Sequence, residues 1–289
     1  YKHKGDGILI TEVLNGGPLD KAGFDVKPGM IIEKIDGDTI SANSDLATYL
    51  NRKAGKFTLL DIIDPANKKE RIQITMKPIS LGTERGLLYK RWVKKNEEEV
   101  DEKSNGQLGY VHIPGMGDGP YRSIYDDMMG RFIDKKGMVI DTRFNGGGDL
   151  VADLVMFFTG VEFNTYATAA KDVGGEPTSR WTKPTLTMFN ESNYSDGSCY
   201  AQAYVDLKIG KTLGMPVPGT CSWAGWEGLP NGGRWGVIPV SAKNIDGKWM
   251  ENLQTEPDIK VKNMPGKIDK GIDQQLERAI KELLNVVNN

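Results

Sequence analysis

Ser195 occupies the setting in this sequence that most suggests covalent chemistry. It follows the apolar run Leu186-Thr187-Met188-Phe189, which is typical of a buried strand, and it precedes residues 201–207, which are typical of a helix. A serine at a strand-to-helix turn can project its hydroxyl from a rigid scaffold, and the backbone N–H groups of the turn can stabilise negative charge. The same Ser-Asp-Gly sequence is also typical of an ordinary helix N-cap. Other features must therefore decide between the two interpretations.

A run of three glycines, residues 146–148, follows the predicted strand 138–141 in the motif D-T-R-F-N-G-G-G. Consecutive glycines let the backbone turn its N–H groups toward a ligand. A dinucleotide-binding loop is excluded because Val151 stands where its third glycine belongs, and Val205 likewise excludes a Walker loop at residues 210–212. We therefore expect the glycine run to form an oxyanion hole.

A serine nucleophile needs a base, and the sequence offers few candidates. It contains two histidines, His3 near the amino terminus and His112 inside a predicted strand, where a histidine is more often structural. The position that the C-terminal processing peptidases fill with a lysine is here Thr220, and Lys208 and Lys211 come earlier. A Ser–Lys dyad is therefore disfavoured.

The composition limits the kinds of protein to which this chain can belong. The chain has 289 residues, of which 38% are hydrophobic and 26% charged, as expected for a globular protein of two domains. A net charge of −2 argues against a nucleic-acid partner, and no apolar run reaches the roughly 20 residues that span a membrane. Because the chain starts at Tyr1, we expect a processed product or an excised piece. Cys199 and Cys221 are either free or paired, and no ligand spacing implies a metal or cofactor.

Residues 5–79 are predicted to form a β-rich domain. Turn signals A-G, P-G and I-D-G occur in that order in P-L-D-K-A-G-F-D-V-K-P-G-M-I-I-E-K-I-D-G, and this segment resembles a PDZ domain of bacterial proteases. The resemblance implies that a C-terminal peptide adds to a sheet edge near residues 7–10; the alternative is a PDZ domain that only packs on its neighbour. The expected strands are 8–14, 57–63 and 71–76, and residues 27–37 are expected to form a turn, a strand and a tight turn. Helices are expected at 18–23 and at 44–51, the latter capped by Asn43 or Ser44.

Residues 80–106 read as a helical connector, with the helix at 81–103, and residues 107–289 as an α/β domain. Sites in partly parallel sheets gather at the carboxyl ends of the strands, where both the glycine run and Ser195 fall. The expected strands are 108–113, 138–141, 185–189, 236–239 and 258–261, and the expected helices are 121–132, 149–158, 196–207 and 271–287. Residues 219–228 and 230–236 are expected to be Gly/Trp-rich loops.

Four motifs in order after the PDZ-like segment, G-Y-V-H-I-P-G-M, D-T-R-F-N-G-G-G, N-E-S-N-Y-S-D-G and M-E-N-L-Q-T-E-P-D-I, resemble the tricorn branch of the C-terminal processing serine peptidases. The resemblance covers nearly the whole chain and implies an α/β fold, a PDZ domain followed by a crotonase-like catalytic domain. It implies Ser195 as nucleophile, the Gly148 and Asp196 amides as oxyanion hole, and Glu251 as the acid of a Ser-His-Ser-Glu tetrad. It also implies substrate contacts by Gly147 and by the Asp196 side chain, which would favour a basic residue before the scissile bond.

In this family the remaining Ser-His pair of the tetrad precedes the PDZ domain, and the position of His112 is not catalytic. Our hypothesis is therefore that this chain holds the nucleophile, oxyanion hole and acid but not the base. The expected partners are peptides or unfolded proteins, and the full-length protein is expected to be a homo-oligomer. The alternatives are an inactive peptide-binding scaffold and, less favoured, an acyl-CoA enzyme of the crotonase fold. For the compartment, the bacterial periplasm or cell envelope is weighed against the cytoplasm.

Overall fold

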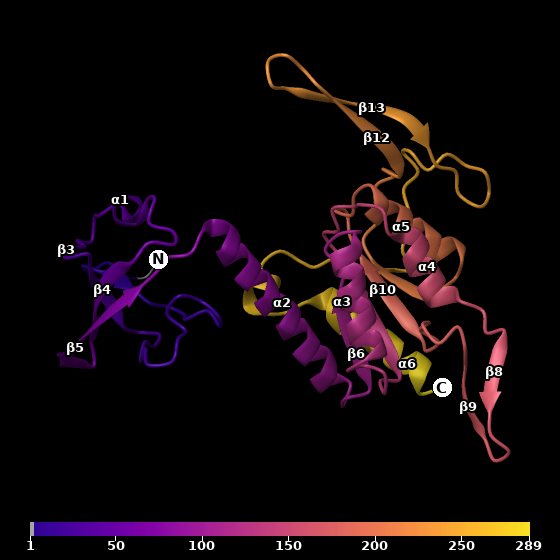
Figure 1. Ribbon diagram of the computed structural model, residues 1–289, viewed down its shortest axis with the longest axis horizontal. Helices are drawn as coiled ribbons and strands as arrows, with labels where there is room; N and C mark the ends of the chain where they lie inside the picture. Colours follow the sequence, from indigo (N-terminus) through magenta and orange to yellow (C-terminus); the bar gives the residue numbers. More distant parts are fainter. Residues whose placement is uncertain (1–2) are drawn as a thin grey trace. The chain divides into compact units, whose positions relative to one another are not determined.

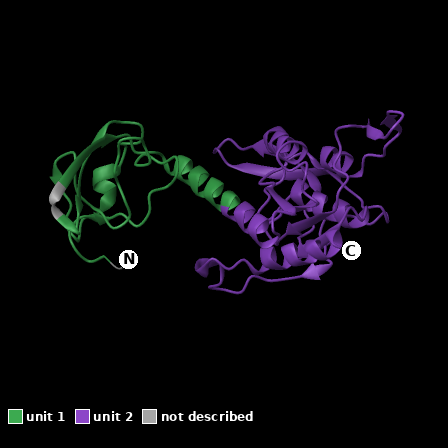
Figure 2. Ribbon diagram, turned by 90° about the horizontal axis from the view of Figure 1, so that it is seen from below, with its two compact units in different colours: residues 1–94 green, residues 95–289 purple. Residues whose placement is uncertain are grey.

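The computed structural model describes residues 3–289, apart from the side chains of residues 68–70. The chain divides into two compact units, Tyr1–Lys94 and Lys95–Asn289 (Figure 2). The division falls inside a single long helix, α2 (Leu81–Lys103), which covers the residues predicted to be helical. The predicted domain boundaries, 5–79, 80–106 and 107–289, stay predictions, because a division within a helix does not test where domains begin.

The first unit is built on an antiparallel sheet with the strand order β1-β2-β4-β5. The short strand β3 also pairs with β2. Alternate residues of β2 and β4, including Ile35, Leu60 and Ile62, are buried on one face and form its core. The elements are β1 (Ile8–Leu9), β2 (Ile31–Ile35), β3 (Asp38–Thr39), α1 (Leu46–Leu50), β4 (Thr58–Asp64) and β5 (Asn67–Met76).

Three local predictions for this unit were wrong. The strand predicted at residues 8–14 pairs with β2 only at Ile8–Leu9. Residues 18–23 form i→i+3 turns and no helix, because one isolated helical turn fixes many dihedrals for a single hydrogen bond. Helix α1 is capped by Asp45, whose carboxylate accepts the N–H of Ala47, and not by Asn43 or Ser44.

The second unit is organised around a five-stranded sheet of order β14-β11-β10-β7-β6, and every pairing in it is parallel. Its central strands are buried on both faces, which explains why they read as continuous apolar runs and not as alternating patterns. The strands are β6 (Leu108–His112), β7 (Gly137–Asp141), β10 (Thr185–Phe189), β11 (Lys211–Gly214) and β14 (Ile259–Lys260).

Helices cover both faces of this sheet (Figure 1). The crossovers between β6, β7, β10 and β11 all advance in one direction, so right-handed connections put their helices on the same face. Those helices share one core cluster, and α6 packs on β7, β10 and β11. The helices are α3 (Asp118–Met129), α4 (Val151–Thr159), α5 (Asp196–Asp206), the 3-10 turn η1 (Ile268–Lys270) and α6 (Gln274–Val287).

Two hairpins extend from the second unit (Figure 1): β8 (Asn164–Ala167) with β9 (Asp172–Glu176), and β12 (Ser222–Gly228) with β13 (Arg234–Ser241). The prediction of loops over residues 219–228 and 230–236 was therefore wrong. Both strands of the second hairpin are mostly exposed, so the alternation that normally marks a strand is absent. Within the described residues, no helix combines the length and the apolar character needed to cross a membrane.

Candidate active site

Ser195 stands at the turn between β10 and α5 and has a strained backbone, with φ 52° and ψ −125°. Such a conformation persists only where the surroundings over-determine it. Here the Ser195 N–H donates to Oγ1 of Thr220 at 2.9 Å, and the Tyr194 N–H donates to the carbonyl of Asn145 at 2.9 Å. The turn is therefore fixed by two other loops at the same edge of the sheet.

The glycine run lies directly against this turn. A Cβ on Gly147 would lie 2.7 Å from Cβ of Ser195, and a Cβ on Gly148 would lie 1.7 Å from the carbonyl oxygen of Met116. Both glycines also have positive φ, 88° and 149°. Only glycine fits this close backbone approach. Buried Asn145 holds the loop, accepting the Gly147 N–H at 2.8 Å and donating to the Ile113 carbonyl at 2.8 Å.

The segment after β10 interlocks with the segment after β7. The Asn190 Oδ1 accepts the Phe144 N–H at 3.0 Å, and the Asn193 side chain donates to Oγ1 of Thr142 at 3.1 Å. These asparagines belong to the motif N-E-S-N-Y-S-D-G and their partners to D-T-R-F-N-G-G-G. The two motifs recognised separately in the sequence thus form one hydrogen-bonded structure.

An open cavity of about 230 Å³ lies at the turn that carries Ser195. Gly148, Ser195 and Asp196 all line this cavity, together with the first strand of the exposed hairpin. Among residues 3–289, neither the Gly148 nor the Asp196 N–H has a protein acceptor. Unpaired donors next to a hydroxyl are what an oxyanion hole requires.

Glu251 lies close to the same cavity. Its Oε2 accepts a hydrogen bond of 2.5 Å from Oγ of Ser222, and Ser222 lines the cavity. Cys221 forms a disulfide with Cys199, with a Cα–Cα distance of 5.0 Å, which joins this segment to the first turn of α5. Structure thus resolves the question of cysteine pairing that the sequence left open, and it ties Ser222 to the helix that Ser195 precedes.

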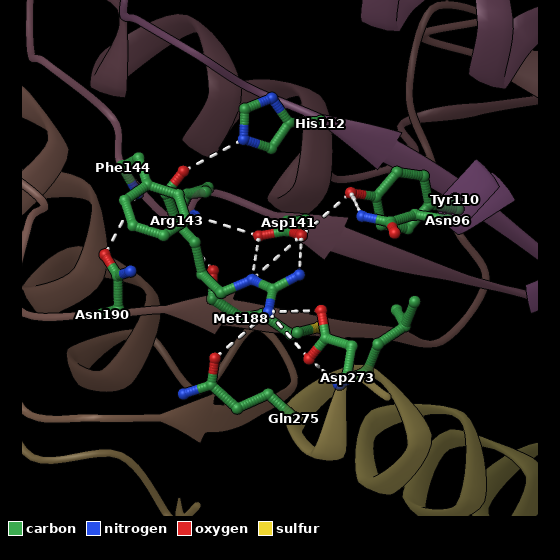
Figure 3. A network of polar contacts seen from close by, with 12 residues as sticks. Asn96, Tyr110, His112, Asp141, Arg143, Phe144, Met188, Asn190, Asp273 and Gln275 are labelled. Atoms are coloured by element: carbon green, nitrogen blue, oxygen red, sulfur yellow. Dashed lines mark hydrogen bonds and ion pairs between the residues drawn. The ribbon is translucent and has the colours of Figure 1, made fainter. Parts of the chain in front are cut away.

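A buried ionic network underlies the glycine loop (Figure 3). The Arg143 guanidinium donates to Asp141 at 2.6 Å and to Asp273, the N-cap of α6, at 2.8 Å. Burial alone would raise the pKa of Asp141, but Arg143 outweighs it and holds that pKa below its usual value. Tyr110 also donates to Asp141 at 2.9 Å. The loop after β7 is therefore anchored to the sheet and to α6.

His112 belongs to this network and not to the cavity lining. Its Nε2 lies 3.0 Å from the Arg143 carbonyl, so Nε2 carries the proton and donates it. Burial lowers the pKa of His112, which keeps the ring neutral at neutral pH. This environment agrees with the expectation of a structural histidine.

The Asp196 carboxylate has a role that sequence reasoning missed. Its Oδ2 accepts the N–H groups of Leu150 and Val151, at 2.7 and 3.3 Å, at the start of α4. Sequence reasoning considered Thr220 only as the position of a missing lysine and missed its hydrogen bond to Ser195, and it missed Ser222 as the partner of Glu251. Each contact spans a distance in the sequence that only the folded sheet closes.

Comparisons with known proteins show the family to which this chain belongs. Residues 107–261 match peptidase family S41, and residues 10–80 match the tricorn protease PDZ domain. The tricorn protease of Thermoplasma acidophilum is 26% identical over 307 residues, which cover 100% of this chain and 27% of that protein. The tricorn protease homolog of Saccharolobus solfataricus is 30% identical over 279 residues, which cover 91% of this chain and 24% of that protein.

The crystal structure of the tricorn protease superposes with a TM-score of 0.81 at 23% identity, over 99% of this chain and 28% of that one, which supports the shared fold. The chain thus spans about a quarter of the length of the curated relatives that it matches. The family match includes the strands, the glycine loop, Ser195 and Glu251. With its PDZ domain ahead of an α/β peptidase domain, this chain belongs to peptidase family S41 and is tricorn-like.

Proposed function

We propose that the second unit is the catalytic part of a serine peptidase in which Ser195 attacks the carbonyl carbon of a peptide bond. The N–H groups of Gly148 and Asp196 then stabilise the oxyanion of the tetrahedral intermediate. The observation that carries the proposal is that Ser195, Gly148 and Asp196 line one cavity, while the Gly148 and Asp196 N–H groups have no acceptor among the described residues. A serine that served only as the N-cap of α5 would need neither the cavity nor the unpaired amides.

Glu251 is the acid member of the proposed site. It accepts a hydrogen bond from Ser222 at the cavity wall and so brings a negative charge close to the nucleophile. Such a carboxylate can orient a base and stabilise the cation formed when the base takes the serine proton. Ser222 holds the carboxylate in position for this role.

The base, in this proposal, is the histidine of a Ser-His pair that lies among residues preceding Tyr1 in the parent protein. The described residues that line the cavity include neither histidine nor lysine. Thr220 stands at the position where related peptidases have a lysine. Its hydroxyl cannot serve as the base, and it accepts the Ser195 N–H instead. We therefore expect Ser195 to react slowly in the isolated chain and rapidly in the extended protein.

Extended peptides or unfolded proteins are the proposed substrates, contacted near the nucleophile by the Gly147 backbone and by Asp196. The preference for a basic side chain that the resemblance implies for Asp196 stays a prediction. The PDZ unit is proposed to take a C-terminal peptide at the edge of β1, the terminal strand of the sheet order. Ile8 and Leu9 pair with β2 through the other edge of this strand, and the Gly7 N–H donates to the Ile40 carbonyl at 2.9 Å.

A peptidyl phosphonate tests the proposed function, because it reacts with an activated serine and stays attached to it. We expect slow labelling of this chain at Ser195, rapid labelling of a protein extended upstream, and none in Ser195→Ala. Mass spectrometry of the digested protein locates the label. Rapid, stoichiometric labelling of the present chain would contradict the external base. Absence of labelling in both proteins would favour the inactive peptide-binding scaffold.

A further inference from the structure

Asp196 joins the two halves of the proposed site through its side chain. Its backbone follows the nucleophile, and its carboxylate accepts the Leu150 and Val151 N–H groups at 2.7 and 3.3 Å. Helix α4 has no side-chain cap of its own, because its N-cap residue is Leu150. The carboxylate of Asp196 therefore caps α4 from another helix, and its negative charge also suits the positive end of the helix dipole.

The capped residues, Leu150 and Val151, are separated from Gly148 by a single residue. Gly148 precedes Asp149, whose N–H donates to the Met116 carbonyl at 2.8 Å, and Leu150 comes next. The loop is thus fixed on one side by a backbone carbonyl and on the other by Asp196. Loss of the second contact would free the segment that carries the Gly148 amide.

We propose that the Asp196 side chain is a positioning residue, which holds the Gly148 amide in register with the Ser195 hydroxyl by capping α4. This inference rests on the proposed function, since it assigns the oxyanion role to that amide. Burial raises the pKa of Asp196, whereas the two N–H groups that it accepts favour the ionised form. A carboxylate engaged in this way has one oxygen occupied at α4, which competes with recognition of a basic substrate side chain.

A role in positioning the loop and a role in recognising a basic side chain predict different effects on substrate selectivity. Two peptidyl phosphonates that differ only in their reacting residue, arginine-like or leucine-like, would be compared on the wild type, Asp196→Ala and Asp196→Asn. If Asp196 positions the loop, Asp196→Ala lowers the labelling rates of both compounds by the same factor, roughly 10- to 100-fold. Asp196→Asn restores part of both rates, because its amide oxygen can still accept the N–H of Leu150.

A second measurement needs no activity. Hydrogen exchange of the peptide that contains residues 148–152 should be about tenfold faster in Asp196→Ala, with partial recovery in Asp196→Asn. Asp153→Asn is the matched control, because Asp153 is an exposed carboxylate in the first turn of α4 whose side chain has no hydrogen bond or ion pair among the described residues. Its exchange and labelling should equal those of the wild type.

Two results would overturn the inference. One is a rate loss confined to the arginine-like compound, which would make Asp196 a specificity residue. The other is unchanged exchange of residues 148–152 in Asp196→Ala. If the label does not reside on Ser195, the proposed function fails while the exchange measurement still tests the capping role.

Discussion

The disulfide between Cys199 and Cys221 provides the most quantitative prediction. The two cysteines are 22 residues apart in the sequence. Closing a loop of this length lowers the entropy of the unfolded chain, and the loop-closure relation gives about 3.4 kcal/mol at 25 °C. Replacing both cysteines by alanine should therefore lower the free energy of unfolding of the second unit by about 3 kcal/mol.

Urea unfolding measures this difference. Trp181 is buried in the second unit, so its fluorescence reports the transition of that unit. With a denaturant slope of about 2 kcal/mol per molar urea, a loss of about 3 kcal/mol should lower the midpoint by about 1.5 M. Treating the wild type with a dithiol reductant should give a similar shift, whereas the double alanine variant should not respond to the reductant.

The disulfide should also affect the site. Cys221 lies between Thr220, which accepts the Ser195 N–H, and Ser222, which bonds to Glu251. Reduction at a urea concentration where the unit stays folded should therefore slow phosphonate labelling of Ser195. A midpoint shift below about 0.3 M would refute the loop-entropy reasoning. Unchanged labelling after complete reduction would refute the claim that the disulfide holds the cavity wall.

The remaining predictions concern single side chains. Gly148→Ala should reduce labelling at least about 100-fold, because its Cβ would meet a backbone carbonyl oxygen at 1.7 Å, whereas Gly146→Ala meets nothing within 4 Å and should label normally. Asp141→Asn should cost about 3–5 kcal/mol in urea unfolding at neutral pH by leaving buried Arg143 undercompensated. Because the pKa of Asp141 is lowered, this difference should be full above the unfolded value of about 3.9 and shrink as pH falls through the folded one. In the protein extended upstream, Ser222→Ala should lower the labelling rate about tenfold while the chain stays folded, since it removes a charge-assisted hydrogen bond to Glu251.

The sequence by itself determined the local elements around the site. The apolar run before Asn190 predicts a strand over the residues of β10, and the polar turn and the following apolar residues predict helix α5. The triple glycine predicts a loop after the strand of residues 138–141, and the structure has a loop there, against Ser195. These features were predictable because they depend on residues that are neighbours in the chain.

Only the tertiary structure decided which residues complete the site. The Thr220 and Ser222 contacts, the disulfide of Cys199 and the cap that Asp196 provides for α4 each join segments that the parallel sheet brings to one edge. For a different reason, only residues 236–239 of the hairpin β12–β13 were predicted as strand: both strands are mostly exposed and carry no burial pattern. Such contacts depend on strand order and register, which are set by packing over the whole unit and leave no short-range signal in the sequence.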